Sequence, residues 1–160
     1  MVREDAETLD YALDDVDRGI LYALQRDARN STAHEIAEEV EVSASTVRNR
    51  IANLEETGVI EAYQPIINYE KAGYQLRVIF VATVSTDERA RLGADALSVE
   101  GVIDVREMMT SQRNLFIEVI ARNTRDLTAI TEELNDLGLE ILSSEIVVAH
   151  HFQAFGDLEF

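Results

Sequence analysis

The sequence contains no cysteine, one proline and a single lysine, Lys71, among its 160 residues. Without cysteine there is no disulfide framework, thiolate zinc site or cysteine nucleophile, which excludes several classes of enzyme and zinc finger. No apolar run approaches the roughly 20 residues that span a bilayer, and the opening MVREDAETLD has no apolar secretory core. We therefore expect a cytoplasmic protein with no membrane partner.

Positive charge is also scarce, because 31 acidic residues face 14 basic ones and the formal net charge is −17. DNA affinity usually comes from Lys and Arg that neutralise phosphates, so the bulk charge argues against a nucleic-acid partner. A halophilic host, such as a halophilic archaeon, would make DNA binding compatible with this negative charge, because molar salt screens charges to within about 3 Å. The alternative is an ordinary host and an acidic protein whose carboxylates lie on solvated helix faces.

Apolar residues recur at helical spacing in three segments before Gly58. The first helix is predicted over 14–28 with Asp14 or Asp15 as its N-cap, and the second follows a polar cap at 30–32. Ser43 is the predicted N-cap of the third helix, which Gly58 ends. The stripes that should face a common core are Val16, Ile20, Leu21 and Leu24, then Ala33, Ile36, Ala37 and Val40, then Val47, Ile51 and Leu54.

Three helices with a short turn before the third are typical of a helix-turn-helix, whose third helix enters the major groove. Its non-core face carries arginine, asparagine and hydroxyl side chains, which are suited to bases and phosphates. Residues 43–54 contain two arginines and no acid, so the acids are kept off this surface. Ser45, Arg48, Asn49 and Ala52 should point outward, and the predicted DNA-binding residues are Ser43, Ser45, Thr46, Arg48, Asn49, Arg50 and Asn53.

Beyond Gly58 two short β-prone runs flank Pro65 and predict either a small wing hairpin or an extended arm. Residues 76–149 then show the order strand, helix, strand, strand, helix, strand, which predicts an α+β fold. Gly101 and Gly138 hold matching places in a weak repeat, where a left-handed glycine would end each helix. The predicted strands are 76–85, 102–109, 115–121 and 139–149, and the predicted helices are 87–99 and 126–137.

The chain is accordingly divided into five predicted parts. They are an acidic leader (1–13), a helix-turn-helix domain (14–63), a linker (64–75), a βαββαβ domain (76–149) and a C-terminal tail (150–160).

No motif in the sequence supports catalysis. There is no histidine in a nucleophile motif, no glycine-rich phosphate loop and no zinc-protease helix. His150 and His151 are adjacent, and neighbouring residues on a strand point to opposite faces, so they cannot easily chelate one ion. We expect no enzymatic activity, no cofactor and no metal.

The segment from LDDVDRGIL to NYEKAGY resembles the N-terminal domain of the Lrp/AsnC family, the leucine-responsive or feast/famine regulators, and the resemblance extends over nearly the whole chain. It implies a winged helix-turn-helix joined to a ferredoxin-like ligand-sensing domain, the RAM domain. It also implies a regulator of transcription that binds double-stranded DNA and forms homodimers, commonly assembled into tetramers or octamers, through its C-terminal sheets. The specific motifs are Leu13-Asp-x-x-Asp17, Asp27-x-Arg29, Ile36-Ala37, Val42-Ser43-x-Ser45-Thr46-Val47, Arg50, Leu54-Glu55 and Gly58-Val59-Ile60.

The resemblance further implies an amino-acid effector at a Thr-Gly-x-x-Asp type loop between the second and third strands. This chain has Ser111 in place of the glycine and Asn114 in place of the aspartate, so the carboxylate that would hold an ammonium group is missing. The predicted effector-binding residues are Thr110, Ser111, Gln112, Arg113 and Asn114, of which Arg113 would hold a carboxylate. The alternative is an ordinary polar hairpin loop.

Two other functions are compatible with the same residues. In one, residues 76–149 form a small-molecule-binding regulatory module and the helix-turn-helix docks protein rather than DNA. In the other, the βαββαβ domain is an enzyme, which the lack of catalytic motifs disfavours.

Overall fold

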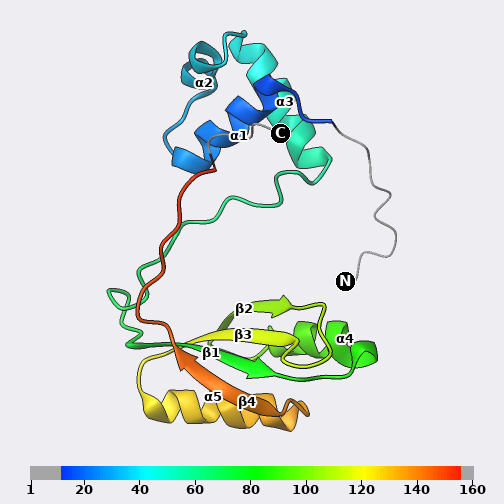
Figure 1. Cartoon of the computed structure of the whole chain (residues 1–160). Helices are drawn as coiled ribbons and strands as arrows, with labels where there is room; N and C mark the ends of the chain where they lie inside the picture. The colour runs from blue at the N-terminus through cyan, green and yellow to red at the C-terminus, as the bar shows by residue number, and fades with distance from the viewer. Residues whose placement is uncertain (1–11, 156–160) are drawn as a thin grey trace. The chain divides into compact units, whose positions relative to one another are not determined.

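The computed structural model describes residues 12–155, which form two compact units (Figure 1). The first unit contains residues 12–65 together with 151–155, and the second contains residues 66–150. Most of the predicted leader and the last five residues of the predicted tail lie outside the described residues. Within residues 12–155 no helix has the length and apolar character needed to cross a membrane.

The first unit consists of three helices, α1 (Asp15–Asp27), α2 (Ala33–Glu39) and α3 (Ala44–Glu56). Their predicted positions are confirmed to within one or two residues. They pack around a core formed by Ile20, Ala23, Ile36, Ala37, Val47 and Leu54, all of which are buried.

Each helix begins at a polar side chain that accepts a hydrogen bond from the backbone of the first turn. The Asp14 carboxylate accepts from the Asp17 N–H at 2.9 Å, and the Asp17 carboxylate accepts from the Asp14 N–H at 3.2 Å. Thr32 and Glu35 form the same reciprocal box before α2, and the Ser43 hydroxyl caps α3. Such caps satisfy N–H groups that have no partner within the helix, each worth about 1 kcal/mol.

Gly58 follows α3 with φ 75°, which confirms its predicted role in ending the helix. The predicted wing hairpin is wrong for this chain, because no strand lies between residues 57 and 75. The segment is instead the extended arm. Pro65 lacks the N–H that a β-ladder needs, and the arm has no partner strand to pair with.

One side chain anchors the arm to α3. The Tyr63 hydroxyl donates to the Glu55 carboxylate at 2.8 Å, and partial burial together with this carboxylate raises the pKa of Tyr63 to about 12.

The second unit is a four-stranded antiparallel sheet in the order β2-β3-β1-β4, and the predicted βαββαβ order is confirmed. The central strands β1 (Leu76–Ala82) and β3 (Leu115–Ala121) lie between the edge strands β2 (Val102–Glu107) and β4 (Ile141–Ile146). Two helices, α4 (Thr86–Ala96) and α5 (Thr124–Asp136), connect the strands.

Both helices cover the same face of the sheet. Alternate residues of β1 and β3, such as Val78 and Ile117, pack there against Leu92 of α4 and Leu134 of α5. The intervening residues form the other face, where Arg77 lies opposite Ile120 and Ile79 opposite Glu118. Glu118 is only 5% exposed, because Arg77 and Arg106 both bond its carboxylate, the latter at 3.0 Å.

Gly101 and Gly138 provide a matched test of the glycine prediction. Both have positive φ, of 97° and 91° respectively, as the repeat predicts. A Cβ on Gly101 would lie 2.6 Å from Ile130 Cδ1 and 3.0 Å from the Ile120 carbonyl oxygen, whereas a Cβ on Gly138 would meet nothing within 4 Å.

We expect Gly138→Ala to lower the free energy of unfolding by about 1–2 kcal/mol, the cost of a left-handed L-residue. Gly101→Ala should cost a further 1–3 kcal/mol or so through overpacking. Urea denaturation of both variants measures this difference. Equal losses would contradict the close packing of α5 on Gly101.

Candidate functional site

The solvent face of α3 has the side chains that the helical spacing predicts. Ser45, Arg48, Asn49 and Ala52 are exposed, and Thr46, Arg50 and Asn53 lie half-buried at its flanks. Residues 43–54 include no acid, and the two carboxylates of α3, Glu55 and Glu56, are confined to its last turn.

Most arginines of the described first unit are paired with carboxylates. Arg18 pairs with Asp15 at 3.0 Å and Arg26 with Glu39 at 2.6 Å. The exception on α3 is Arg48, which forms no ion pair with any residue in the range 12–155. Its guanidinium is therefore the cation that α3 offers to a partner.

The two hydroxyls at the start of α3 are engaged with each other. The Ser43 and Thr46 hydroxyl oxygens lie 2.8 Å apart, and the Ser43 hydroxyl also accepts from the Thr46 N–H at 3.1 Å. Their mutual bond uses one of the two hydroxyl protons, so one of the two hydroxyls can donate to an incoming phosphate while this arrangement stays formed.

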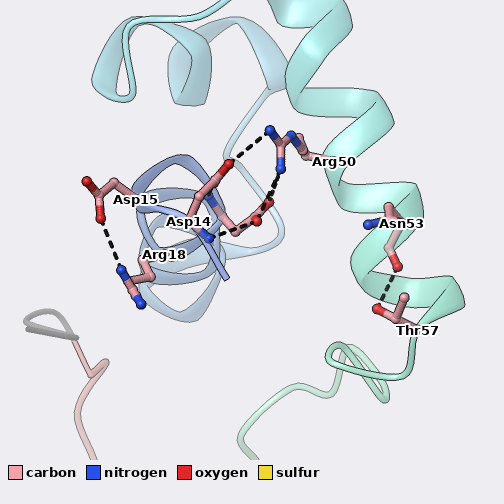
Figure 2. Close-up of polar contacts among 7 residues, drawn as sticks. Asp14, Asp15, Arg18, Arg50, Asn53 and Thr57 are labelled. Carbon is pink, nitrogen blue, oxygen red and sulfur yellow. Dashed lines mark hydrogen bonds and ion pairs between the residues drawn. The ribbon is translucent and has the colours of Figure 1, made fainter. Parts of the chain in front are cut away.

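Arg50 points toward α1 rather than away from the unit (Figure 2). One guanidinium nitrogen lies 2.9 Å from the Asp14 carboxylate, and another lies 3.2 Å and 3.4 Å from the two carboxylate oxygens of Asp17. The Asp17 side chain is fully buried, whereas that of Arg50 is 37% exposed. The Asp17 N–H and Arg50 together hold the pKa of the Asp14 carboxyl below its usual value.

This geometry favours a structural role for Arg50 over the readout role expected from the sequence. A buried carboxylate without a cation loses several kcal/mol of hydration free energy, so Arg50 is committed to Asp17 before any DNA arrives. It is a positioning residue that ties α3 to the start of α1. The sequence carried a signal for Asp17, which stands three residues before Ile20 at a core position of the first apolar stripe.

The predicted effector loop is mostly exposed, but Asn114 is not part of its surface. Asn114 is 1% exposed, and its side chain accepts from the Val84 N–H at 3.0 Å and donates to the Val84 carbonyl at 2.8 Å. Both ends of its amide are thus used to join the start of β3 to the residues after β1. The expectation that Asn114 binds an effector is wrong, because a ligand cannot reach it.

Two other loop residues also make bonds within the unit. The Thr110 hydroxyl donates to the Gln112 carbonyl at 2.7 Å. Arg113 has φ 52°, donates its N–H to the Thr83 hydroxyl at 2.7 Å and places its guanidinium 3.4 Å from the Glu145 carboxylate. Within residues 12–155, the side chains of Ser111 and Gln112 form no hydrogen bond or ion pair.

The histidines are not gathered into a site. His34 lies 3.5 Å from Glu38 on α2, and His150 and His151 are exposed after β4. Residues 12–155 contain no group of three or more His, Asp or Glu side chains placed to hold a metal ion.

Comparisons with known proteins agree with this geometry. Residues 13–61 match a family model described as winged helix-turn-helix DNA-binding. An HTH-type transcriptional regulator of Pyrococcus abyssi is 36% identical over 115 residues, which is 72% of each chain.

Solved structures share the fold of both units. The leucine response regulatory protein LrpA of Mycobacterium tuberculosis has a TM-score of 0.75 and 22% identity, covering 91% of this chain and 99% of that one. A transcriptional regulator of Neisseria meningitidis, solved as a complex with L-Met, has a TM-score of 0.75 and 19% identity, covering 91% and 96%.

The fold and the helix-turn-helix define a DNA-binding regulator of transcription, and not an enzyme. The chain belongs to the Lrp/AsnC family of helix-turn-helix transcriptional regulators, and residues 66–150 are its RAM domain.

The different tasks of the two arginines can be separated by the salt dependence of operator binding. Arg48→Gln should weaken binding by about 1–3 kcal/mol if Arg48 reads a base, or lower the salt slope by about 0.9 if it binds a phosphate.

The matched change for Arg50 is the double variant Asp17→Asn with Arg50→Gln, which removes both charges and leaves no buried carboxylate unpaired. We expect it to keep the wild-type salt slope, because Arg50 neutralises no phosphate. Fluorescence anisotropy across a potassium chloride series measures both slopes. A slope that falls with the double variant but not with Arg48→Gln would reverse the two roles.

Proposed function

We propose that α3 lies in the major groove of double-stranded DNA and reads it with Arg48 and Asn49, supported by Ser43, Ser45, Thr46 and Asn53. The observation that carries this proposal is Arg48, which is exposed, forms no ion pair within residues 12–155 and lies in the acid-free stretch 43–54 of an otherwise acidic chain. Arginine donates two bonds to guanine, and asparagine bridges adenine. Two copies of α3 would contact pseudo-palindromic half-sites about one helical turn apart.

The functional unit that we propose is a homodimer formed through the RAM domain. Edge strand β4 and the residues after it expose large apolar side chains, among them Ile146 at 67% and Val148 at 94%. Contiguous exposed apolar surface at a sheet edge favours pairing with another chain. Tetramers and octamers would add further interfaces to this dimer.

Regulation by a small molecule is also proposed. The related regulator of Neisseria meningitidis was solved with L-Met. The loop 110–114 of this chain lacks the glycine and aspartate expected of a loop that binds an amino acid, and its Asn114 is buried. An effector of this protein would therefore differ in chemistry or in position from an amino acid held by that loop.

The charge balance supports a cytoplasmic protein of a halophilic host. With 31 acidic residues against 14 basic ones, operator binding in dilute salt would suffer repulsion between the chain and DNA. At molar salt this repulsion is screened to within about 3 Å, while bonds from α3 to base edges persist.

Selection of bound sequences from random duplex DNA tests the DNA-binding proposal. We expect one enriched pseudo-palindrome with half-sites roughly 10 base pairs or a multiple apart, recovered also at molar potassium chloride. A helix-turn-helix that docks protein instead of DNA would enrich no motif at any salt concentration.

Substitutions at the exposed β4 edge test the homodimer. Ile146→Asp should convert the dimer to a monomer, because it places a charge in the centre of the proposed apolar contact. Leu97→Asp is the matched control, since Leu97 is 54% exposed just after α4, away from β4. Light-scattering mass distinguishes the two. A dimer that survives Ile146→Asp would place the interface elsewhere.

A further inference from the structure

The residues just before β1 form a compact turn that is clasped to the RAM domain. The Ala72 N–H donates to the Asn68 carbonyl at 3.1 Å, and the Tyr74 N–H donates to the Tyr69 carbonyl at 2.9 Å. Gly73, with φ 97°, allows the chain to reverse there. We call residues 68–74 the linker turn, because they join the arm after α3 to the sheet.

Arg77 of β1 and Arg122, just after β3, contact the aromatic rings of the linker turn. The Arg77 guanidinium lies 5.8 Å from the centre of the Tyr69 ring, and the Arg122 guanidinium lies 5.6 Å from the centre of the Tyr74 ring. The two rings meet edge to face at 6.5 Å. Cation–π contacts of this kind contribute about 0.5–1 kcal/mol each at exposed sites. We call the two arginine–tyrosine contacts the clasp; they hold the linker turn, and a competing cation can shift them.

A cavity of about 380 Å³ lies directly beside this clasp. Tyr74 and Arg122 are part of its lining, and α5 contributes Asp126, Ala129 and Glu133 from one helix face. Ile120 and Ile130 are also among its lining residues. The volume is within the range of small-molecule sites, which combine an apolar lining with a few polar groups.

The charges at the rim define the chemistry that this cavity would accept. Glu100, Asp126 and Glu133 supply three carboxylates, against the single guanidinium of Arg122. No described residue forms an ion pair with Glu100 or Glu133. With the strongly negative charge of the whole chain, this rim attracts organic cations and repels anions.

We propose that this cavity is an effector site for a small aliphatic amine, and that its occupant acts on the DNA-binding unit through Tyr74 and the linker turn. The inference rests on the proposed function, an effector-regulated regulator, and moves its effector site from loop 110–114 to the cavity. The aliphatic chain of the amine lies along the apolar atoms of the lining, and its ammonium groups bond the carboxylates of Glu100, Asp126 or Glu133. A cation bound there repels Arg122 and competes with it for the Tyr74 ring, which shifts the contact between them.

Isothermal titration of the full chain with diaminopentane tests the site, with pentylamine, pentanoate and potassium chloride as comparison ligands. We expect saturable binding of one diamine per chain, weaker binding of the monoamine and none of the anion. If potassium chloride gave the same heat as the diamine, the signal would come from screening of the acidic surface, and the proposal would be overturned.

Two pairs of variants locate the binding. Ala129→Leu fills the cavity from an exposed position of α5 and should abolish saturable binding, whereas Thr128→Leu, next to it but outside the lining, should not.

Glu133→Gln should weaken binding about tenfold, as expected for the loss of a charge-assisted bond, and Glu132→Gln should leave it unchanged. Unaltered binding to Ala129→Leu, with its thermal unfolding also unaltered, would overturn the assignment.

Operator binding with and without saturating diaminopentane tests the coupling. We expect a change in operator affinity of about fivefold or more, which disappears in Ala129→Leu. Binding of the diamine without any change in operator affinity would reject the cavity as an effector site. Operator binding in the absence of diamine is measured in the same experiment, so failure of this inference is distinguishable from failure of DNA binding itself.

Discussion

The buried carboxylate of Asp17 is the constraint on which the DNA-binding unit depends. It lies inside a three-helix core, where Arg50, 33 residues later in the chain, brings a guanidinium to it. The same carboxylate closes the reciprocal cap with Asp14. One side chain therefore links the start of α1 to α3, the helix that we propose contacts DNA.

This arrangement explains how an acidic chain can present a surface to a polyanion. The guanidinium of Arg50 offsets the negative charges of Asp14 and Asp17, so these carboxylates repel a polyanion near α3 less strongly. Arg48 keeps its charge available at the exposed face. DNA recognition then rests on the local geometry of one helix rather than on net charge. The acids elsewhere keep the chain hydrated and, under the proposed role of the cavity beside α5, select a cationic effector.

Local periodicity and caps were sufficient to predict most of the fold. The outward face of α3, the caps at Asp14 and Ser43 and the left-handed Gly101 all depend on residues a few positions apart, so the sequence reveals them. The errors concern long-range contacts. The pairing of Arg50 with Asp17 and of Asn114 with Val84 joins residues 30 or more positions apart, and no periodic pattern encodes such partners. The β-prone runs beside Pro65 left a wing hairpin and an extended arm open, because β-propensity cannot show whether a partner strand exists.

The central prediction is that Arg48 contacts DNA while Arg50 holds α3 against the start of α1. The side-chain Nε–H resonances of the two arginines report on this difference directly. In NMR spectra of the protein titrated with its operator duplex, we predict that the Arg48 resonance shifts and becomes protected from solvent exchange. The Arg50 resonance should already be protected in the free protein and should keep its position. A large shift of Arg50 on DNA binding, with Arg48 unchanged, would contradict the account.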